Sequence, residues 1–292
     1  MSWMSIWLRG LAMGAADAVP GVSGGTVALL TGIYERWLAV LTAVTPELWA
    51  VFRNNGIHGL WARLDGAFVL PLLIGILMSL MTLAHWIKDW LDLVPERVWG
   101  FFFGLVVAMG IALLSNLRSA MRVKDWGLLT FGVLIALGLG LQTPQTADPA
   151  LWVWPFAGAM ALSAMLLPGI SGSFLLLLTG LYPALIGAVS AFDLRVLLLF
   201  IGGGAIGILL MAHLIKALLV KYHTEVLSCL TGVVFGALVR VWPWQGAVDD
   251  GSLILLLPTQ QMLWIPLAFG LCGFLSASLA LKFATDNGTM IR

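Results

Sequence analysis

Two short segments combine residues that break a helix with residues that start one. Residues 19–34 read VPGVSGGTVALLTGIY, and residues 167–182 read LPGISGSFLLLLTGLY. In each, a proline removes a backbone donor and pushes the preceding residue out of helical conformation, while glycines allow turns that other residues resist. A serine then precedes a new apolar run, which it can cap as a helix. Each segment therefore predicts a broken helix whose first amides are unused hydrogen-bond donors.

Such amides form a ready site for an anion. Ser23 and Ser171 are the expected helix caps. Gly32 and Gly180, two turns further on, are expected to be packing glycines. A break of this kind persists in a membrane only where it lines a cavity, because unsatisfied backbone groups are costly in lipid. The predicted donors are the amides of Gly24, Gly25 and Thr26 in the first segment and of Gly172, Ser173 and Phe174 in the second.

The two segments are copies of each other. They share 9 identities in 16 positions at a constant offset of 148, and AHWIK from Ala84 is echoed by AHLIK from Ala212. We therefore divide the chain into two membrane repeats, residues 1–147 and 148–292, the first of which carries a relatively polar insert that ends at Asp65. The expected apolar segments, five in each repeat, are 3–18, 22–43, 66–88, 97–115 and 125–142, then 151–167, 171–192, 194–219, 224–241 and 260–283.

Composition places these repeats in a membrane. Hydrophobic residues make up 61% of the chain and charged residues only 10%, against about 25% charged in soluble domains. An all-α polytopic membrane protein is expected, with no separate soluble domain. The chain has no basic tail or basic-aromatic cluster, so nucleic acid is not an expected partner. Cys229 and Cys272 lie in apolar segments without metal-ligand spacing, and neither a metal nor a cofactor is expected.

The distribution of lysine and arginine favours inverted repeats. The first segment of each repeat reaches only about 24 Å, short of the roughly 30 Å hydrocarbon core. If the first two segments form a re-entrant hairpin or both cross, 11 of the 15 basic residues lie on one face and four on the other. If only the second segment crosses, the split is 7 to 8. The positive-inside rule favours the first arrangement, with both termini cytoplasmic.

Several charged residues are candidates for a ligand or coupling role. An acid as deep as Asp17 is expensive in a membrane, and either function or pairing with Arg9 explains it. Glu35 and Arg36 suggest an interfacial ion pair or a headgroup contact. His85 and His213, beside Lys88 and Lys216, suit anchoring at helix ends or a ligand role. If the amides do not bind the anion, the alternative ligands are Arg9, Arg118, His85 and His213.

Enzyme chemistry has little support in the sequence. Membrane lipid phosphatases can also be built from inverted repeats with a PGxS element, but they need clustered acids and an arginine that clamps phosphate. Here glycine follows Ser23 and Ser171, and no helix carries two spaced carboxylates or a metal-type His/Glu set. A transporter is therefore expected, and a lipid phosphatase is the less favoured alternative.

The segments GAADAVPGVSGGTVALLTGIYE and LLPGISGSFLLLLTGLY resemble the two signatures of the bacterial polyprenyl-phosphate transporter family PopT. The resemblance implies that the protein moves undecaprenyl phosphate, the carrier lipid of cell-wall synthesis, from the outer to the inner leaflet of the cytoplasmic membrane. Serine at 173, where the first signature has glycine, leaves open whether both halves bind phosphate equally. The family motif maps onto Asp17, Pro20, Gly21, Ser23, Gly24, Gly25 and Thr26, and onto Pro168, Gly169, Ser171, Gly172 and Ser173.

The chemistry of a lipid phosphate fits these residues. Only the charged headgroup needs a pocket, because the isoprenoid tail can stay in lipid. Two broken helices in inverted repeats could offer that pocket alternately to each side. Asp17 or Glu35 could carry a coupling proton, or transport could follow the lipid gradient. The alternative from another class is a carrier or channel for a small inorganic anion, and no feature of the sequence specifies an oligomeric state.

Overall fold

The protein is described by a computed structural model that covers residues 1–17, 23–141, 149–247, 253–255 and 260–286. Its described side chains exclude those at 83–89, 91–92, 190, 245–247, 253–255, 260–262, 280–281 and 283–286. This part of the chain is helical except for one short hairpin and the connections. The first-half helices are α1 (Trp3–Asp17), α2 (Gly24–Leu30), α3 (Tyr34–Thr42), α4 (Glu47–Arg63), α5 (Gly66–Leu93), α6 (Pro95–Leu117) and α7 (Val123–Gly140).

The second half repeats most of this order. Its elements are α8 (Val153–Leu166), α9 (Gly172–Leu178), α10 (Leu181–Ser190), α11 (Leu194–Lys221), α12 (His223–Gly236), the 3₁₀ turn η1 (Ala237–Val239), β1 (Gln245–Ala247), β2 (Leu253–Leu255) and α13 (Gln260–Asp286). The antiparallel hairpin of β1 and β2 pairs Gln245 with Leu255 and Ala247 with Leu253. The sequence analysis predicts no strand in this region.

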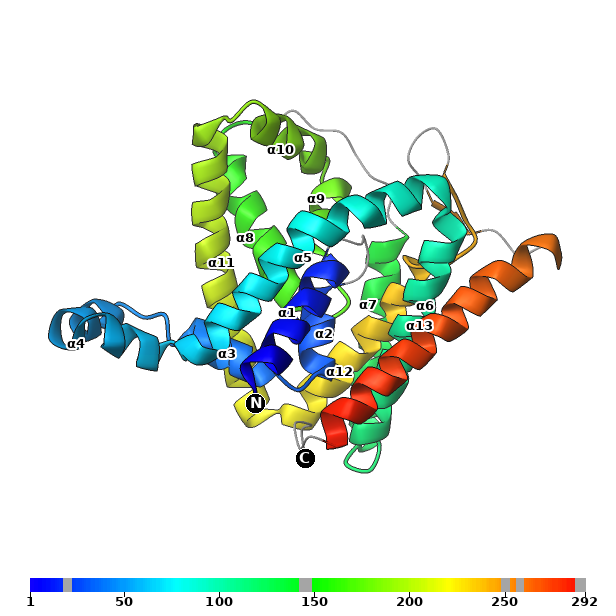
Figure 1. Ribbon diagram of the computed structural model, residues 1–292, viewed down its shortest axis with the longest axis horizontal. Coiled ribbons are helices and arrows are strands. Elements are labelled where there is room, and N and C mark those ends of the chain that lie inside the picture. The colour runs from blue at the N-terminus through cyan, green and yellow to red at the C-terminus, as the bar shows by residue number, and fades with distance from the viewer. Residues whose placement is uncertain (18–22, 142–148, 248–252, 256–259, 287–292) are drawn as a thin grey trace.

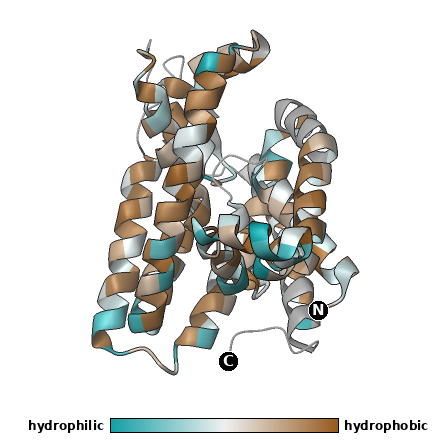
Figure 2. Cartoon of the chain, turned by 90° about the vertical axis from the view of Figure 1, so that its left-hand side faces the viewer, coloured by the Kyte–Doolittle hydropathy of each residue, from teal (hydrophilic) through white to brown (hydrophobic). Residues whose placement is uncertain are grey.

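The long helices have the length and composition of a multi-pass membrane protein. Among the described residues, α6, α7 and α11 are each long and apolar enough to cross a bilayer. Two bent pairs, α4 with the start of α5 and α9 with α10, raise the number of candidate spans to five if each pair is one span. Figure 2 shows that the long helices are mostly hydrophobic, with hydrophilic residues mainly near their ends.

Four helix pairs build the body of the molecule. α1 packs along α5 and α8 packs along α11, so the expected first and third segments pair within each half. α6 packs along α13 and α7 along α12, so the last two segments pair between the halves (Figure 1). Glycines allow the close approach: a Cβ at Gly104 would overlap the backbone of Gly270, and one at Gly158 would overlap Phe200. Small residues at helix contacts are typical of membrane proteins.

The second segment of each half is broken into two helices rather than continuous. Gly32 (φ 69°) lies between α2 and α3, and Gly180 (φ 73°) lies between α9 and α10. The expectation that both lie two turns into a helix is wrong: each lies between two helices, in the left-handed conformation that glycine takes without strain. α9 and the described start of α10 meet at 114°. The sharp bend keeps this segment from crossing as one straight helix.

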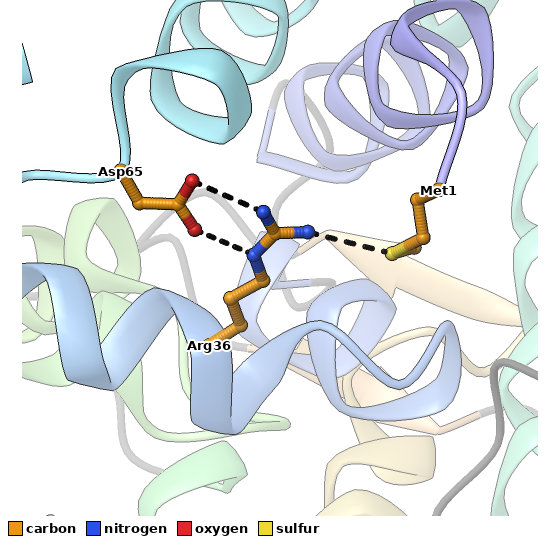
Figure 3. Close-up of polar contacts among 3 residues, drawn as sticks. All are labelled: Met1, Arg36 and Asp65. Carbon is orange, nitrogen blue, oxygen red and sulfur yellow. Dashed lines mark hydrogen bonds and ion pairs between the residues drawn. The ribbon is translucent and has the colours of Figure 1, made fainter. Parts of the chain in front are cut away.

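The insert of the first half forms α4, which projects away from the helix pairs (Figure 1). Gly56 (φ 61°, ψ −154°) kinks it, and none of its residues is buried. At its base, Arg36 of α3 makes a bidentate contact with Asp65, through Nε at 2.7 Å and Nη2 at 3.1 Å (Figure 3). The same guanidinium lies 4.4 Å from the Phe68 ring centroid and contacts the Met1 sulfur. This cluster ties the N-terminus to the start of α5.

We expect Gly104→Ala to lower the thermal unfolding temperature of the purified protein in detergent. The added Cβ would meet backbone atoms of α13, which cannot move away as a flexible side chain can. Gly138→Ala in α7 is the matched control, because a Cβ there meets nothing within 4 Å. Equal melting temperatures for the two variants would contradict the close packing of α6 on α13.

Candidate functional site

The first broken segment satisfies its own amides. Gly24 donates its amide to Asp17 Oδ1 at 2.7 Å, and Gly25 donates to Ser23 Oγ at 3.2 Å. The Thr26 amide donates to the Ser23 carbonyl at 2.9 Å. Ser23 is thus the expected cap of α2, but the expectation of three unused amides is wrong here. The Asp17 carboxylate occupies the place that the sequence suggested for an external anion.

The second broken segment differs from the first. Leu167 is extended (φ −82°, ψ 118°) as expected before a proline, and Gly169 has a φ of 81°. Ser171 does not cap α9; its hydroxyl lies 2.9 Å from that of Ser173 instead. Within the described chain, the amides of Gly172, Ser173 and Phe174 meet no acceptor. Met165 stands at the position equivalent to Asp17, and among the described residues no carboxylate accepts these amides.

Hydrogen bonds join the two broken segments directly. Gly169 donates its amide to Thr26 Oγ1 at 2.8 Å, and Ser23 donates its hydroxyl to the Met165 carbonyl at 3.3 Å. The Tyr34 hydroxyl, from the buried side chain at the start of α3, donates to the Leu166 carbonyl at 2.9 Å. These contacts bridge more than 130 positions of sequence and place both segments at one junction. Pro20 and Gly21 lie outside the described residues.

The glycines of the junction are also needed for packing. A Cβ at Gly24 would lie 2.5 Å from Asp17 Oδ2, and one at Gly25 would lie 2.8 Å from the Met165 carbonyl oxygen. A Cβ at Gly172 would overlap the Ala161 carbonyl oxygen. A valine at Gly24 or Gly172 would therefore disturb the fold as well as any ligand, and it cannot separate the two roles.

A cavity of about 20 Å³, room for about one water molecule, lies against the second segment. Gly169, Ile170 and Ser171 line it, together with Phe174 of α9 and Arg240, which follows η1. The Arg240 guanidinium carbon lies 4.0 Å from the Phe174 ring centroid, a stacked cation–π geometry. The cavity thus combines a cation, a hydroxyl and the beginning of a helix in one place. These are the groups that bind a phosphate.

Sequence reasoning had counted Arg240 only as a charge for topology. Its distance from the motif, about 70 positions along the chain, hid its role. One signal was present in the sequence. After the insert of the first half, equivalent positions of the two halves differ by 128 rather than 148, as Gly104 and Gly232 do. At this offset Arg240 corresponds to Ala112, so the arginine has no counterpart in the first half. An arginine beside an apolar segment with no counterpart in the other half is the pattern that could have found it.

Most other charged candidates lie away from this junction. Glu35 faces His223 at 3.1 Å rather than Arg36, and Arg36 pairs with Asp65 (Figure 3). His213 is exposed and contacts the carbonyl of Leu209 in its own helix.

Arg118 and Arg9, the two arginines considered as alternative anion ligands, both lie in or at the end of first-half helices. Arg118 is exposed at the end of α6. Arg9 is buried in α1 and donates to the Ser5 carbonyl at 3.1 Å, whereas Asp17 accepts from Gly24. The expected alternative for Asp17, a structural contact with Arg9, is thus replaced by a contact inside the motif. The side chain of His85 lies outside the described residues.

Comparison with known proteins assigns the chain to a family. Residues 13–252 match the VCA0040-like family, described as undecaprenyl phosphate translocase-like. The chain belongs to this family. A polyprenyl-phosphate transporter of Vibrio cholerae is 40% identical over 245 residues, which cover 84% of this chain and 79% of that protein. A polyprenyl-phosphate transporter of Staphylococcus aureus is 29% identical over 304 residues, 98% of each chain. No solved structure matches.

Membership of this translocase-like family confirms the resemblance found in the sequence. It also confirms that the protein is a transporter and not an enzyme. Among the described residues, no three His, Cys, Asp or Glu side chains lie close enough to hold a metal ion. In this family member the junction of the two broken segments is the candidate transport site.

We expect Thr26→Val to destabilise the junction by about 1–3 kcal/mol, because the Gly169 amide would lose its acceptor. Thr130→Val is the control, since the exposed Thr130 hydroxyl bonds only the Trp126 carbonyl of its own helix. Thermal unfolding in detergent measures both. A melting temperature that falls no further for Thr26→Val than for Thr130→Val would show that the bond is unimportant.

Proposed function

We propose that the protein transports undecaprenyl phosphate, or a related polyprenyl phosphate, from the outer to the inner leaflet of a bacterial cytoplasmic membrane. The names of the two relatives support the substrate class. The observation that carries the proposal is the cavity in which Arg240 and the second PGxSG segment meet among apolar helices. Recycling of the carrier lipid for cell-wall synthesis is the cellular role that follows.

The groups around this cavity suit a phosphate monoester. A bare phosphate is costly in lipid, but a guanidinium can bind its oxygens through two parallel hydrogen bonds. The hydroxyls of Ser171 and Ser173 and the first amides of α9 supply neutral donors. α9 has only seven residues, so Arg240 and not a helix dipole provides the main positive charge. The apolar tail needs no such group and stays among lipid chains.

The two halves of the junction offer different environments in this conformation. At α2 the Asp17 carboxylate accepts the Gly24 amide and excludes a second anion. At α9 there is no equivalent acid, and Arg240 faces the cavity. We infer that phosphate binds first beside α9, where its entry must widen the cavity of about 20 Å³, and that the residues of the first segment, Ser23 to Thr26, contact it in the opposite state. Alternating access of this kind is the mechanism of other inverted-repeat transporters.

Inverted topology is part of the proposal. Figure 1 places the beginning of α1 at the lower end of the molecule and the beginning of α8 near the upper end. α13 ends at the same end at which α1 begins (Figure 1). Together with the 11-to-4 split of basic residues, this arrangement supports two re-entrant hairpins that enter from opposite sides, with both termini cytoplasmic.

Cysteine labelling in right-side-out membrane vesicles tests the topology. In a background with Cys229 and Cys272 replaced by serine, we expect Ala191→Cys, in the exposed turn before α11, to react with an impermeant thiol reagent. Asn54→Cys in α4 should react only after the membrane is permeabilised. Labelling of both cysteines from outside would contradict the inverted arrangement.

Transport itself is tested by reconstitution into vesicles that contain a labelled polyprenyl phosphate, with its leaflet distribution followed over time. Faster equilibration than in protein-free vesicles is expected. Uptake of inorganic phosphate without lipid movement would favour the small-anion carrier instead. Release of inorganic phosphate from the lipid, lost in Ser171→Ala, would favour a lipid phosphatase.

Arg240→Gln should weaken binding of a polyprenyl phosphate in detergent by roughly ten- to a hundredfold. A hydrogen bond to a charged group contributes about 1.5–3 kcal/mol, and about 1.4 kcal/mol corresponds to a factor of ten. Arg195→Gln, at the exposed start of α11, is the matched control and should bind normally. Equal affinities for the two variants would place the headgroup site elsewhere.

A further inference from the structure

A second, much larger cavity lies on the other side of the junction. Its volume is about 800 Å³, within the range of about 300–1,000 Å³ that small-molecule sites occupy. Its lining residues come from helices α1, α2, α6 and α13, with Trp90 and Val94 at the end of α5. Its lining includes Ala16, just before the first broken segment, and Val27 within it. The candidate phosphate site does not share any of these lining residues.

Small side chains leave this space open. α1 presents Ala12, Ala15 and Ala16 to it, a spacing that puts the three on one helix face. Across the cavity lie larger apolar side chains, such as Phe102 and Met109 of α6. A helix with leucine at the alanine positions would fill much of the volume. The fold therefore keeps an apolar chamber where dense packing would be usual.

Among the lining residues that the structure describes, Arg97 apart, few side chains can hydrogen-bond a polar ligand. The Thr31 hydroxyl donates to the Val27 carbonyl at 2.7 Å, and the Ser276 hydroxyl donates to the Cys272 carbonyl at 2.7 Å. Both groups are thus satisfied within their own helices. An inorganic anion or a sugar would lose its hydration here without replacement. An apolar chain is the occupant that suits this lining.

The chamber has one charged lining residue among those the structure describes, Arg97. This arginine lies at the start of α6 and is exposed, with its guanidinium carbon 5.9 Å from the Phe269 ring centroid. Trp90, another lining residue, is 56% exposed beside it. In the inverted arrangement, Arg97 lies with Lys88, Arg195 and Arg240 on the face with four basic residues, which the positive-inside rule places at the outer leaflet. A cation above an apolar chamber matches a lipid that has an anionic headgroup and a long apolar chain.

We propose that this chamber is an entry site that holds the first isoprene units of a polyprenyl phosphate while its phosphate pairs with Arg97. The inference rests on the proposed function and adds the part of the site that recognises the isoprenoid chain of the lipid. The phosphate would then leave Arg97 for the cavity beside α9. Recognition of the chain here selects the carrier lipid over inorganic phosphate, which has the same headgroup chemistry but nothing to fill the chamber.

The exposed thiol of Cys272 lines the chamber and reports on its occupancy. In a Cys229→Ser protein purified in detergent, we would measure the rate at which N-ethylmaleimide alkylates Cys272. A long-chain polyprenyl phosphate should slow alkylation at least fivefold, and inorganic phosphate should have no effect. Arg97→Gln should raise the lipid concentration needed for half-protection about tenfold, because the headgroup loses its cation.

A matched pair of alanines on α13 provides the steric test. Ala277 is 6% exposed and lines the chamber, whereas Ala268 is exposed on the same helix. Ala277→Phe should fill the chamber and weaken binding of the long-chain lipid, and Ala268→Phe should bind it normally. Equal protection of Cys272 by phosphatidic acid would overturn the selectivity for an isoprenoid chain.

The result separates this inference from the proposed function. If the Cys229→Ser protein moves polyprenyl phosphate in vesicles but the lipid never protects Cys272, the entry site is wrong and the transport function stands. If the protein neither binds nor moves the lipid, the proposed function itself fails. If Ala277→Phe is unfolded, the Arg97→Gln comparison decides, since Arg97 is exposed and its loss leaves the core intact.

Discussion

The need to satisfy backbone polar groups inside a membrane governs this structure. Two helices break among apolar segments, and each break exposes amides and carbonyls that lipid cannot hydrogen-bond. The protein satisfies many of these groups by setting the breaks against each other: Thr26 accepts from Gly169, and Tyr34 donates to the carbonyl of Leu166. The junction that results is the structural centre and the site that we propose for a polar headgroup.

This constraint also explains the pairing of the helices. The first and third segments of each half pack together, whereas the last two exchange partners between the halves, α6 with α13 and α7 with α12. The second break packs against one of the exchanged pairs, because a Cβ at Gly169 would lie 2.9 Å from the Val233 carbonyl oxygen of α12. Hydrogen bonds such as that from Gly169 to Thr26 join this break to the first. Movement of one half against the other must therefore change the junction. That coupling is what an alternating-access transporter requires.

The two cavities beside the junction differ in size and polarity. Beside α9 the space is small and holds Arg240; beside α2 it is large and apolar, with Arg97 as its charged lining residue. Asp17 fills the anion position on the α2 side. A phosphate and its hydrocarbon tail need opposite environments, and in the proposed function the two cavities supply one each.

The sequence by itself determined the helical membrane fold, the duplicated break and the family. Proline and glycine act locally, so the extended Leu167 and the turn at Gly169 follow from the residues alone. Long apolar runs likewise fixed most helix positions. Only the tertiary structure decided where the donors point. In the folded chain the Gly24 amide donates to Asp17, and Arg240 lies beside the second segment. Neither contact follows from local sequence patterns, because each depends on how the chain folds back on itself.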